Sequence, residues 1–194
     1  DTLDPVYGIL SSTMNITVNA EVVGETDLSN DPTDGPNFRG NNGEEDDDSD
    51  LTVDFGLFRP ISLGNRVWFD TDDSGTLNGS EIGIGGVTVS VYLDADLNGI
   101  PDSATPVATD TTDGNGYYLF EGLAPGSYVV AVDVTNFNAG QPLESLTSST
   151  GNTTTPTDRN DNGLDTLDAT FGILSNTITL TQNSTPTGET DLSN

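Results

Sequence analysis

The stretch "DTDDSGTLNGSE", residues 70–81, has the residue types and spacing of a loop that binds calcium. Oxygen-bearing side chains recur at every second position, with a glycine at the sixth position and a glutamate at the twelfth. Ca²⁺ takes about six to eight oxygen ligands, and the glycine permits the sharp turn that folds such a loop around one ion. We therefore predict metal ligation by Asp70, Asp72, Ser74, Thr76 (through its carbonyl), Asn78 and Glu81. The competing interpretation is a solvated acidic turn that holds no ion.

Two further acidic stretches are candidate metal loops. Residues 94–102, "DADLNGIPD", repeat the alternate spacing, although Thr105 stands where a glutamate at position twelve would be. The predicted ligands in this stretch are Asp94, Asp96, Asn98 and Asp102. In residues 158–165, "DRNDNGLD", the predicted ligands are Asp158, Asn160, Asn162 and Asp165, and a plain Asn-Gly turn is the competing interpretation.

Other acidic residues are either solvated or lend carboxylates to a shared ion. The densest run is "EEDDDSD", residues 44–50, in which Asp48 and Asp50 are candidates. The same two interpretations apply to the further candidates Glu25, Asp27, Glu189 and Asp191.

Strands, not helices, are expected to hold these loops. No stretch shows helical spacing of apolar residues over three turns. Short alternating or β-branched runs instead lie between clusters of Gly, Asp, Asn, Pro and Ser, at 14–19, 51–58, 65–69, 87–93, 117–120, 128–134 and 177–182. This pattern predicts an all-β protein, a Greek-key-type β-sandwich. We interpret its few aromatic residues as core and sheet residues rather than as a platform for stacking carbohydrate.

The composition excludes several classes of function. The chain of 194 residues has a formal net charge of −28, and its only basic side chains are four arginines. Nucleic acids and anionic membranes both require a positive surface, so neither is an expected partner. The chain has no Cys and therefore no disulfide, and no apolar run is long enough to span a membrane. Because the first residue is not Met, we expect the sequence to be part of a longer protein.

The two ends of the sequence are copies of one another. Residues 1–30 match residues 165–194 at eighteen of thirty positions, at an offset of 164. A local duplication within one domain is the alternative, but we interpret the match as one period of a tandem array. Residues 1–60 are then the C-terminal part of one repeat, and residues 61–194 are the N-terminal and central part of the next. Pro60 marks the expected junction.

Several motifs in this order resemble a known family. The segments "SLGNRVWFDTDDSGTLNGSEIGIGGVTVSVYLD" (62–94) and "TDTTDGNGYYLFEGLAPGSYVVAV" (109–132) resemble the SdrD B-like repeats. These repeats belong to the wider Cna-B-like group of prealbumin-type β-sandwiches in bacterial surface adhesins. The resemblance implies calcium-stabilised, rod-forming extracellular modules, whose calcium loop would fall on Asp70, Asp72, Ser74, Asn78 and Glu81. The chain has no Lys, however, so the Lys-based isopeptide bonds of many Cna-B-type domains cannot form here.

These features together predict a structural role. We expect a calcium-stabilised module of a secreted or cell-surface fibre, which packs head-to-tail with itself through neighbouring repeats or subunits, with strand exchange as one possible form of contact. The alternative is an adhesin module that binds a host protein or glycan, a surface or matrix ligand. We do not expect an enzyme, because the carboxylates lie in turns with metal-ligand spacing and His, Cys and Lys are all missing.

Overall fold

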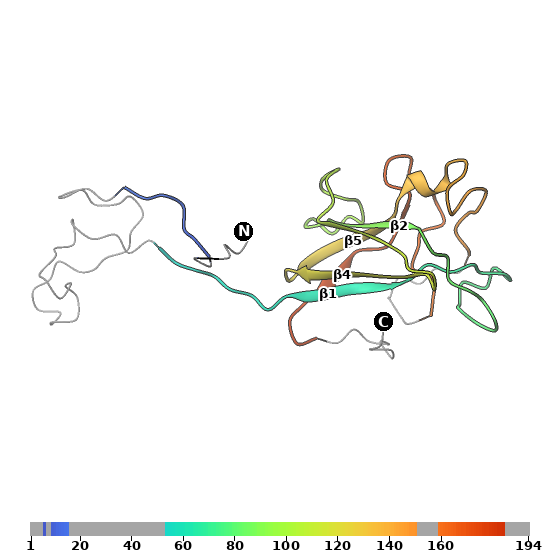
Figure 1. The fold of residues 1–194 in the computed structure, drawn as a ribbon, viewed down its shortest axis with the longest axis horizontal. Helices are drawn as coiled ribbons and strands as arrows, with labels where there is room; N and C mark the ends of the chain where they lie inside the picture. Colours follow the sequence, from blue (N-terminus) through green and yellow to red (C-terminus); the bar gives the residue numbers. More distant parts are fainter. Residues whose placement is uncertain (1–5, 7–8, 16–52, 151–158, 185–194) are drawn as a thin grey trace, which may run out of the picture. The chain divides into compact units, whose positions relative to one another are not determined.

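The computed structural model describes Val6 and residues 9–15, 53–150 and 159–184 of the chain. The chain divides into two compact units, Asp1–Leu57 and Phe58–Asn194. All the strands of the described residues lie in the second unit (Figure 1). The sequence predicts two strands that begin in the first unit, at 14–19 and 51–58. Residues 16–19 of the former and 51–52 of the latter lie outside the described residues. Residues 53–57 are described, but they form no strand.

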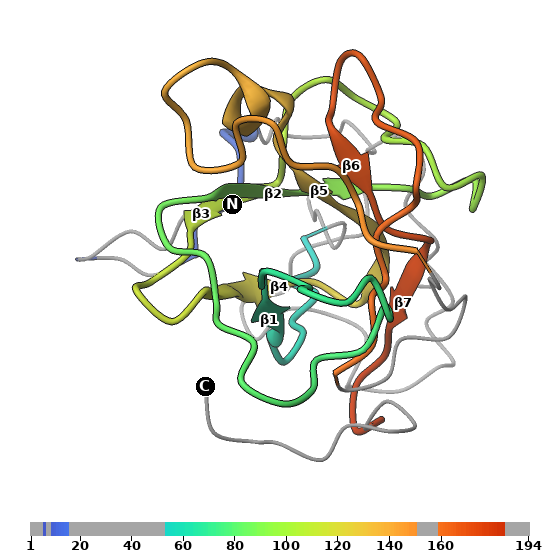
Figure 2. The same ribbon diagram turned by 90° about the vertical axis from the view of Figure 1, so that its right-hand side faces the viewer.

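The second unit is built from antiparallel strands. They are β1 (Ile61–Arg66), β2 (Thr88–Leu93), β3 (Ala108–Thr111), β4 (Tyr117–Leu123), β5 (Gly126–Val132), β6 (Ile173–Leu174) and β7 (Ile178–Leu180). The described residues also include the 3-10 turn η2 (Val134–Phe137). β1 and β4 form a two-stranded sheet, whereas the larger sheet has the order β3-β2-β5-β6, and β7 also pairs with β5. Figure 2 shows β1 and β4 facing β2, β3 and β5. The predicted all-β sandwich is confirmed.

The main core lies between the two sheets. Val89 and Val91 of β2 and Tyr128 and Val130 of β5 point to the same face, because alternate side chains of a strand share a face. They meet Phe120 and the other buried residues of this cluster, which are Val87, Leu123, Leu143 and Leu180. Burial of large apolar side chains away from water is the main favourable term that holds the two sheets together.

A second, smaller core covers the outer face of the larger sheet. Tyr92 on β2, Val129 and Ala131 on β5 and Leu174 on β6 are buried there. Phe171 packs edge-on against Tyr92, with the ring centroids 5.3 Å apart. Both central strands are therefore buried on their two faces, which explains why consecutive residues, and not only alternate ones, are apolar at Val91 and Tyr92 of β2 and along Tyr128–Val132 of β5.

Two backbone contacts hold together the two ends of the loop formed by residues 70–81. The Phe69 amide donates a hydrogen bond to the Ile82 carbonyl at 2.9 Å, and Trp68 forms an isolated bridge with Gly83. A Cβ atom at Gly83 would lie only 1.6 Å from the main-chain oxygen of Asn115, so no larger residue fits in this backbone arrangement. The loop therefore begins and ends at neighbouring points of the sandwich. The indole Nε1 of Trp68, the only tryptophan, is buried and has no hydrogen-bond partner among the described residues.

Among the described residues, no helix is long and apolar enough to cross a membrane.

Candidate metal centres

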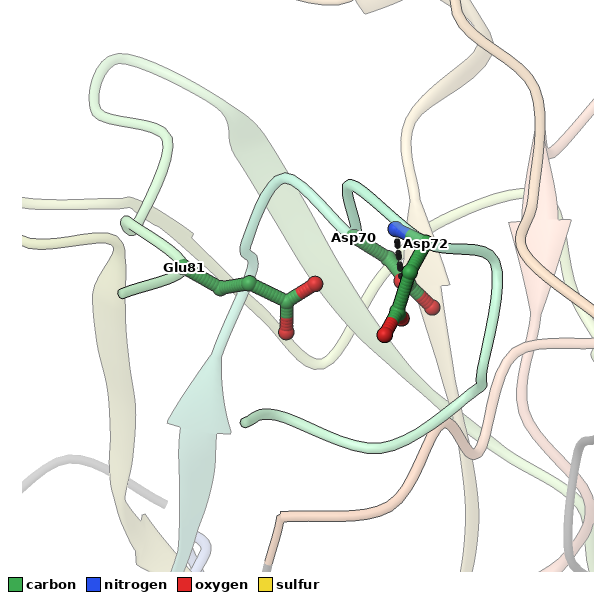
Figure 3. Close-up of side chains that lie close together, drawn as sticks. All are labelled: Asp70, Asp72 and Glu81. Carbon is green, nitrogen blue, oxygen red and sulfur yellow. Dashed lines mark hydrogen bonds between the residues drawn. The ribbon is translucent and has the colours of Figure 1, made fainter. Parts of the chain in front are cut away.

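Residues 70–81, the first acidic loop, bring three carboxylates together. Asp70, Asp72 and Glu81 each offer a carboxylate oxygen, and these oxygens lie within 4.8 Å of one another. Figure 3 shows the Glu81 side chain pointing towards Asp70 and Asp72 from the opposite side of the loop. These residues are the first, third and twelfth of the loop, and all three are predicted ligands. In an extended chain the twelfth residue would lie far from the first and third. The fold therefore assembles a group of oxygens that could hold a cation.

Asp70 organises the turn through its carboxylate. Its two oxygens accept hydrogen bonds from the amides of Asp72, Ser74 and Gly75, at 3.3, 3.2 and 2.8 Å. Desolvation is the largest single influence on this group and raises its pKa, but the hydrogen bonds from Gly75, Ser74 and Asp72 outweigh it. The pKa of Asp70 is therefore lowered, and its carboxylate is held in the charged form that binds a cation.

Three further oxygens of the loop converge on the amide of Asn78. Its Nδ2 donates to Ser74 Oγ at 3.0 Å, to the Thr76 carbonyl at 3.1 Å and to Asp72 Oδ2 at 3.4 Å. A side-chain oxygen, a backbone oxygen and a carboxylate thus face one point, where a polar donor satisfies them. The sequence predicts these same three groups, the Asp72 carboxylate, the Ser74 hydroxyl and the Thr76 carbonyl, as metal ligands. Their oxygen lone pairs point towards one place, an arrangement that suits a cation.

Glu81 ties the end of the loop to its beginning. Its Oε1 accepts a hydrogen bond from the Thr71 amide at 2.8 Å, and its Oε2 accepts one from the Asn78 amide at 2.9 Å. Both carboxylate oxygens are therefore directed inward. This orientation is compatible with the bidentate role that a glutamate at position twelve has in calcium loops.

Residues 159–163 pack directly on the first acidic loop. The Asp161 amide donates to the Gly75 carbonyl at 2.8 Å, and the Leu77 amide donates to the Arg159 carbonyl at 2.7 Å. Asn160 forms a bridge with Thr76 between these two bonds. The third predicted loop thus lies against the first acidic loop. Its described residues form no group of three acidic side chains of their own.

Asp161 is a functional candidate that the alternate spacing of residues 158–162 does not predict, since the backbone pairing with Gly75 brings it beside the first acidic loop. Its carboxylate accepts hydrogen bonds from the Gly163 amide at 2.8 Å and from Ser149 Oγ at 3.1 Å. Burial raises its pKa, and the negative charges of Asp165 and Asp70 raise it further. A cation beside Asp70 would offset that repulsion. The predicted ligand Asp158 lies outside the described residues, and Asp165 is exposed.

Residues 94–102, the second acidic loop, form a separate group. Oxygens of Asp94, Asp96 and Asp102 lie within 4.8 Å of one another. Asp96 accepts a hydrogen bond from Asn98 Nδ2 at 2.8 Å, and Asp102 accepts one from the Ala95 amide at 2.8 Å. All four predicted residues of this loop therefore lie together, even though the loop has no glutamate at position twelve.

Asp94 is the most buried acidic residue in the described part of the chain, with no exposed surface. It accepts hydrogen bonds from the amides of Asn98 and Gly99 and from the hydroxyl of Thr177, which precedes β7. Desolvation is the largest influence and raises its pKa, but these hydrogen bonds outweigh it and lower the pKa overall. The second acidic loop is thus linked to a segment more than 80 residues later in the chain.

The fold and the site together define a class of protein: an antiparallel β-sandwich whose loops group carboxylates that could hold a metal ion. Comparison with known proteins gives the family: residues 61–163 match the SdrD B-like domain. The chain therefore belongs to the SdrD B-like domain family, a family of surface adhesin and structural repeat domains and not of enzymes. The predicted resemblance is confirmed.

Curated relatives include large staphylococcal proteins. Serine-aspartate repeat-containing protein F of Staphylococcus epidermidis is 39% identical over 116 residues, which cover 56% of this chain and 6% of that protein. Serine-aspartate repeat-containing protein D of Staphylococcus aureus is 37% identical over 123 residues, which cover 63% of this chain and 8% of that protein. A fibrinogen-binding protein of Staphylococcus epidermidis is 41% identical over 86 residues, which cover 43% of this chain and 7% of that protein. The chain thus spans less than a tenth of each of these relatives. It is a module of the cell-surface adhesin type, extracellular or in the cell wall.

Proposed function

We propose that this chain is a calcium-stabilised structural module of a secreted or cell-surface fibre. The observation that carries the proposal is the convergence of Asp72, Ser74 and Thr76 oxygens on one point in the first acidic loop, beside the carboxylates of Asp70 and Glu81. Ca²⁺ favours this mixture of carboxylate, hydroxyl and backbone oxygens over softer ligands. The second acidic loop supplies a second candidate site with its own three carboxylates.

Cation binding would stabilise the fold because the carboxylates of each loop repel one another. An ion that binds the folded loop but not the unfolded chain contributes its binding free energy to folding. At millimolar extracellular calcium, loops with dissociation constants of about 10⁻⁴–10⁻³ M would be largely occupied. The first acidic loop would also hold residues 159–163 in place, because their backbones are hydrogen-bonded to it.

Thermal unfolding with calcium or with a chelator, together with a count of bound metal, tests this proposal. We expect calcium to raise the Tm by about 5–10 °C when both loops approach saturation. Asp72→Asn and Asp96→Asn should each remove part of the rise and one bound ion. Glu121→Gln is the matched control, since Glu121 is exposed on β4 and belongs to neither loop. An equal Tm in calcium and chelator, with no bound metal, would refute calcium stabilisation.

We further propose that the module packs head-to-tail with a neighbouring repeat or subunit. In this proposal residues 1–60 are the C-terminal part of one repeat and residues 61–194 the N-terminal and central part of the next, and the match of the two ends at an offset of 164 supports it. Phe55, Leu57 and Phe58 are apolar side chains that are more than half exposed. Within the described residues, β1 pairs only with β4, and a sheet of two strands is marginally stable alone. A strand added from a neighbour would extend that sheet.

A peptide of residues 51–60, added to the full chain, tests the head-to-tail contact. We expect it to bind and to shift the backbone amide NMR signals of β1 more than those of β3. A peptide carrying Phe55→Asp and Leu57→Asp is the control and should not bind. Absence of binding by the natural peptide would count against strand addition, whether or not calcium stabilises the fold.

A role as an adhesin module for a host ligand is the second candidate. It is favoured by the match to a relative that is named a fibrinogen-binding protein. Since the match covers only 7% of that relative, direct binding of fibrinogen to this chain must be measured separately. Saturable binding of fibrinogen would support the adhesin role, and its absence would leave the structural role as the preferred function.

A further inference from the structure

The described residues contain four Asn-Gly pairs, and the structure distinguishes one of them. They are Asn78–Gly79, Asn98–Gly99, Asn115–Gly116 and Asn162–Gly163. Such pairs are prone to deamidation, because a glycine offers no side chain to hinder attack by its own amide nitrogen on the preceding side chain. Whether this attack occurs depends on the freedom of the glycine N–H, which differs among the four.

Three of the four glycine amides are engaged. Gly99 donates to Asp94 Oδ2 at 3.1 Å, Gly116 donates to the Asp113 carbonyl at 3.0 Å, and Gly163 donates to Asp161 Oδ1 at 2.8 Å. A nitrogen held in a hydrogen bond must first break that bond before it can lose its proton and turn towards the asparagine. Gly99 and Gly163 donate to carboxylates, which further disfavours loss of the amide proton.

Gly79 is the exception. Its N–H has no hydrogen-bond partner in the described part of the chain, and no heavy atom lies within 4 Å of where its Cβ would be. Its φ of +55° lies in the left-handed region, which glycine adopts at little energetic cost. Both Asn78 and Gly79 are exposed to solvent, so water can reach the reacting atoms.

We propose that Asn78 is the preferred site of spontaneous deamidation among the four Asn-Gly pairs of the described residues. The Gly79 nitrogen forms a bond to Cγ of Asn78, the Cγ–Nδ2 bond breaks, and ammonia leaves with the transferred proton. Water then opens the resulting succinimide at either carbonyl, which gives aspartate or isoaspartate at position 78. The first product adds a negative charge at the ninth position of the first acidic loop, and the second also adds a methylene group to its backbone.

Occupancy of the loop should control this reaction, a point that rests on the proposed calcium function. An ion coordinated by the Asn78 side-chain oxygen would hold its amide in place and keep the loop closed. In a chelator, the side chain keeps only the hydrogen bonds of its Nδ2 to Asp72, Ser74 and Thr76. These contacts are exposed, and water competes for them.

The experiment is prolonged incubation of the full chain in mildly alkaline buffer, with chelator or with calcium, followed by peptide mass spectrometry at all four pairs. In chelator we expect Asn78 to be lost several-fold faster than Asn98, Asn115 or Asn162. Gly79→Ala should slow the loss of Asn78. Gly140→Ala is the matched control, because Gly140 also has positive φ and open space around it but lies in neither acidic loop, and it should leave the Asn78 rate unchanged.

Equal rates at the four pairs, or faster loss at any of the other three, would overturn the assignment of Asn78. Preferential loss of Asn78 that calcium slows supports both the site and the calcium function. Preferential loss that calcium leaves unchanged supports the site and counts against calcium binding at this loop, so the two proposals fail separately.

Discussion

At the scale of single residues, each acidic loop is organised by its first aspartate. Asp70 and Asp94 both accept hydrogen bonds from the backbone amides at the fifth and sixth loop positions, which curls each chain around its carboxylates. Alternate spacing and the glycine at position six predicted both groupings. Asp161 could not be found in this way, because its place beside Asp70 depends on a backbone pairing between segments about 85 residues apart in the chain.

The hydroxyl of Thr177 should stabilise the buried Asp94 carboxylate. Thr177→Val removes this charge-assisted hydrogen bond, and we expect a loss of about 1.5–3 kcal/mol at neutral pH. The control is Thr179→Val, because Thr179 on the adjoining strand bonds only the neutral hydroxyl of Ser127 in an exposed position. That change should cost less than about 1 kcal/mol. Denaturant unfolding of the three chains measures both differences.

The pH dependence of the Thr177→Val effect follows from the lowered pKa of Asp94. A carboxyl whose folded pKa is depressed contributes stability above its unfolded pKa of about 3.9, and this contribution is lost as pH falls through the folded value. The difference between the wild type and Thr177→Val should therefore be full at neutral pH and shrink in acid. An equal difference at neutral and strongly acidic pH would contradict this account.

Asp161 should show the opposite sign. Its raised pKa means that ionisation disfavours the folded state, so stability is lost as pH rises from the unfolded pKa through the folded value. In chelator at neutral pH, Asp161→Asn keeps the acceptor for the Gly163 amide and should stabilise the chain by about 1 kcal/mol or less. If Asp161 also contacts the ion, the same variant should reduce the rise in Tm caused by calcium. If Asp161→Asn were less stable than the wild type in chelator, the negative charge of Asp161 would not destabilise the fold, which would contradict this prediction.

At the scale of elements, apolar β-branched runs predicted β2, β5 and β7 to within a few residues. β4 was expected to end at 120 and extends to Leu123, and the strand expected at 65–69 is instead β1 at Ile61–Arg66. β3 and β6 were missed. The sequence of β3, "ATDT", carries no apolar alternation, and it is a strand because its backbone completes the edge of the sheet beside β2. Tertiary pairing, which local sequence does not encode, explains these differences.

Among the residues that flank the first acidic loop, we expect Gly83, which forms the bridge with Trp68, to tolerate substitution least. Gly83→Ala would place a Cβ atom 1.6 Å from a main-chain oxygen, so the backbones must separate. We expect a destabilisation of about 3 kcal/mol or more, together with weaker calcium binding. Gly114→Ala is the control, because no atom lies within 4 Å of its Cβ position and its φ is not positive. That change should stay within about 0.5 kcal/mol, as judged by denaturant unfolding.

At the scale of the whole chain, the charge of −28 opposes compaction unless cations offset it. Sodium chloride should therefore raise the Tm in chelator by screening, because the Debye length falls from about 10 Å at 0.1 M to about 3 Å at 1 M salt. If calcium stabilises the module as we propose, it should give the same rise at a far lower concentration, because an ion held at defined sites acts well below the concentrations that screening needs. Identical responses at equal ionic strength would reduce the effect of calcium to screening.

The position of Trp68 gives the chain an internal optical reporter. Its indole lies at the bridge with Gly83, where the first acidic loop begins, two residues before Asp70, and its buried N–H has no hydrogen-bond partner among the described residues. Because this is the only tryptophan in the sequence, its emission comes from one known place. Closure of the loop on a cation would change the polarity and mobility around the ring. Fluorescence of the unlabelled protein can therefore follow events at the first acidic loop separately from those at the second.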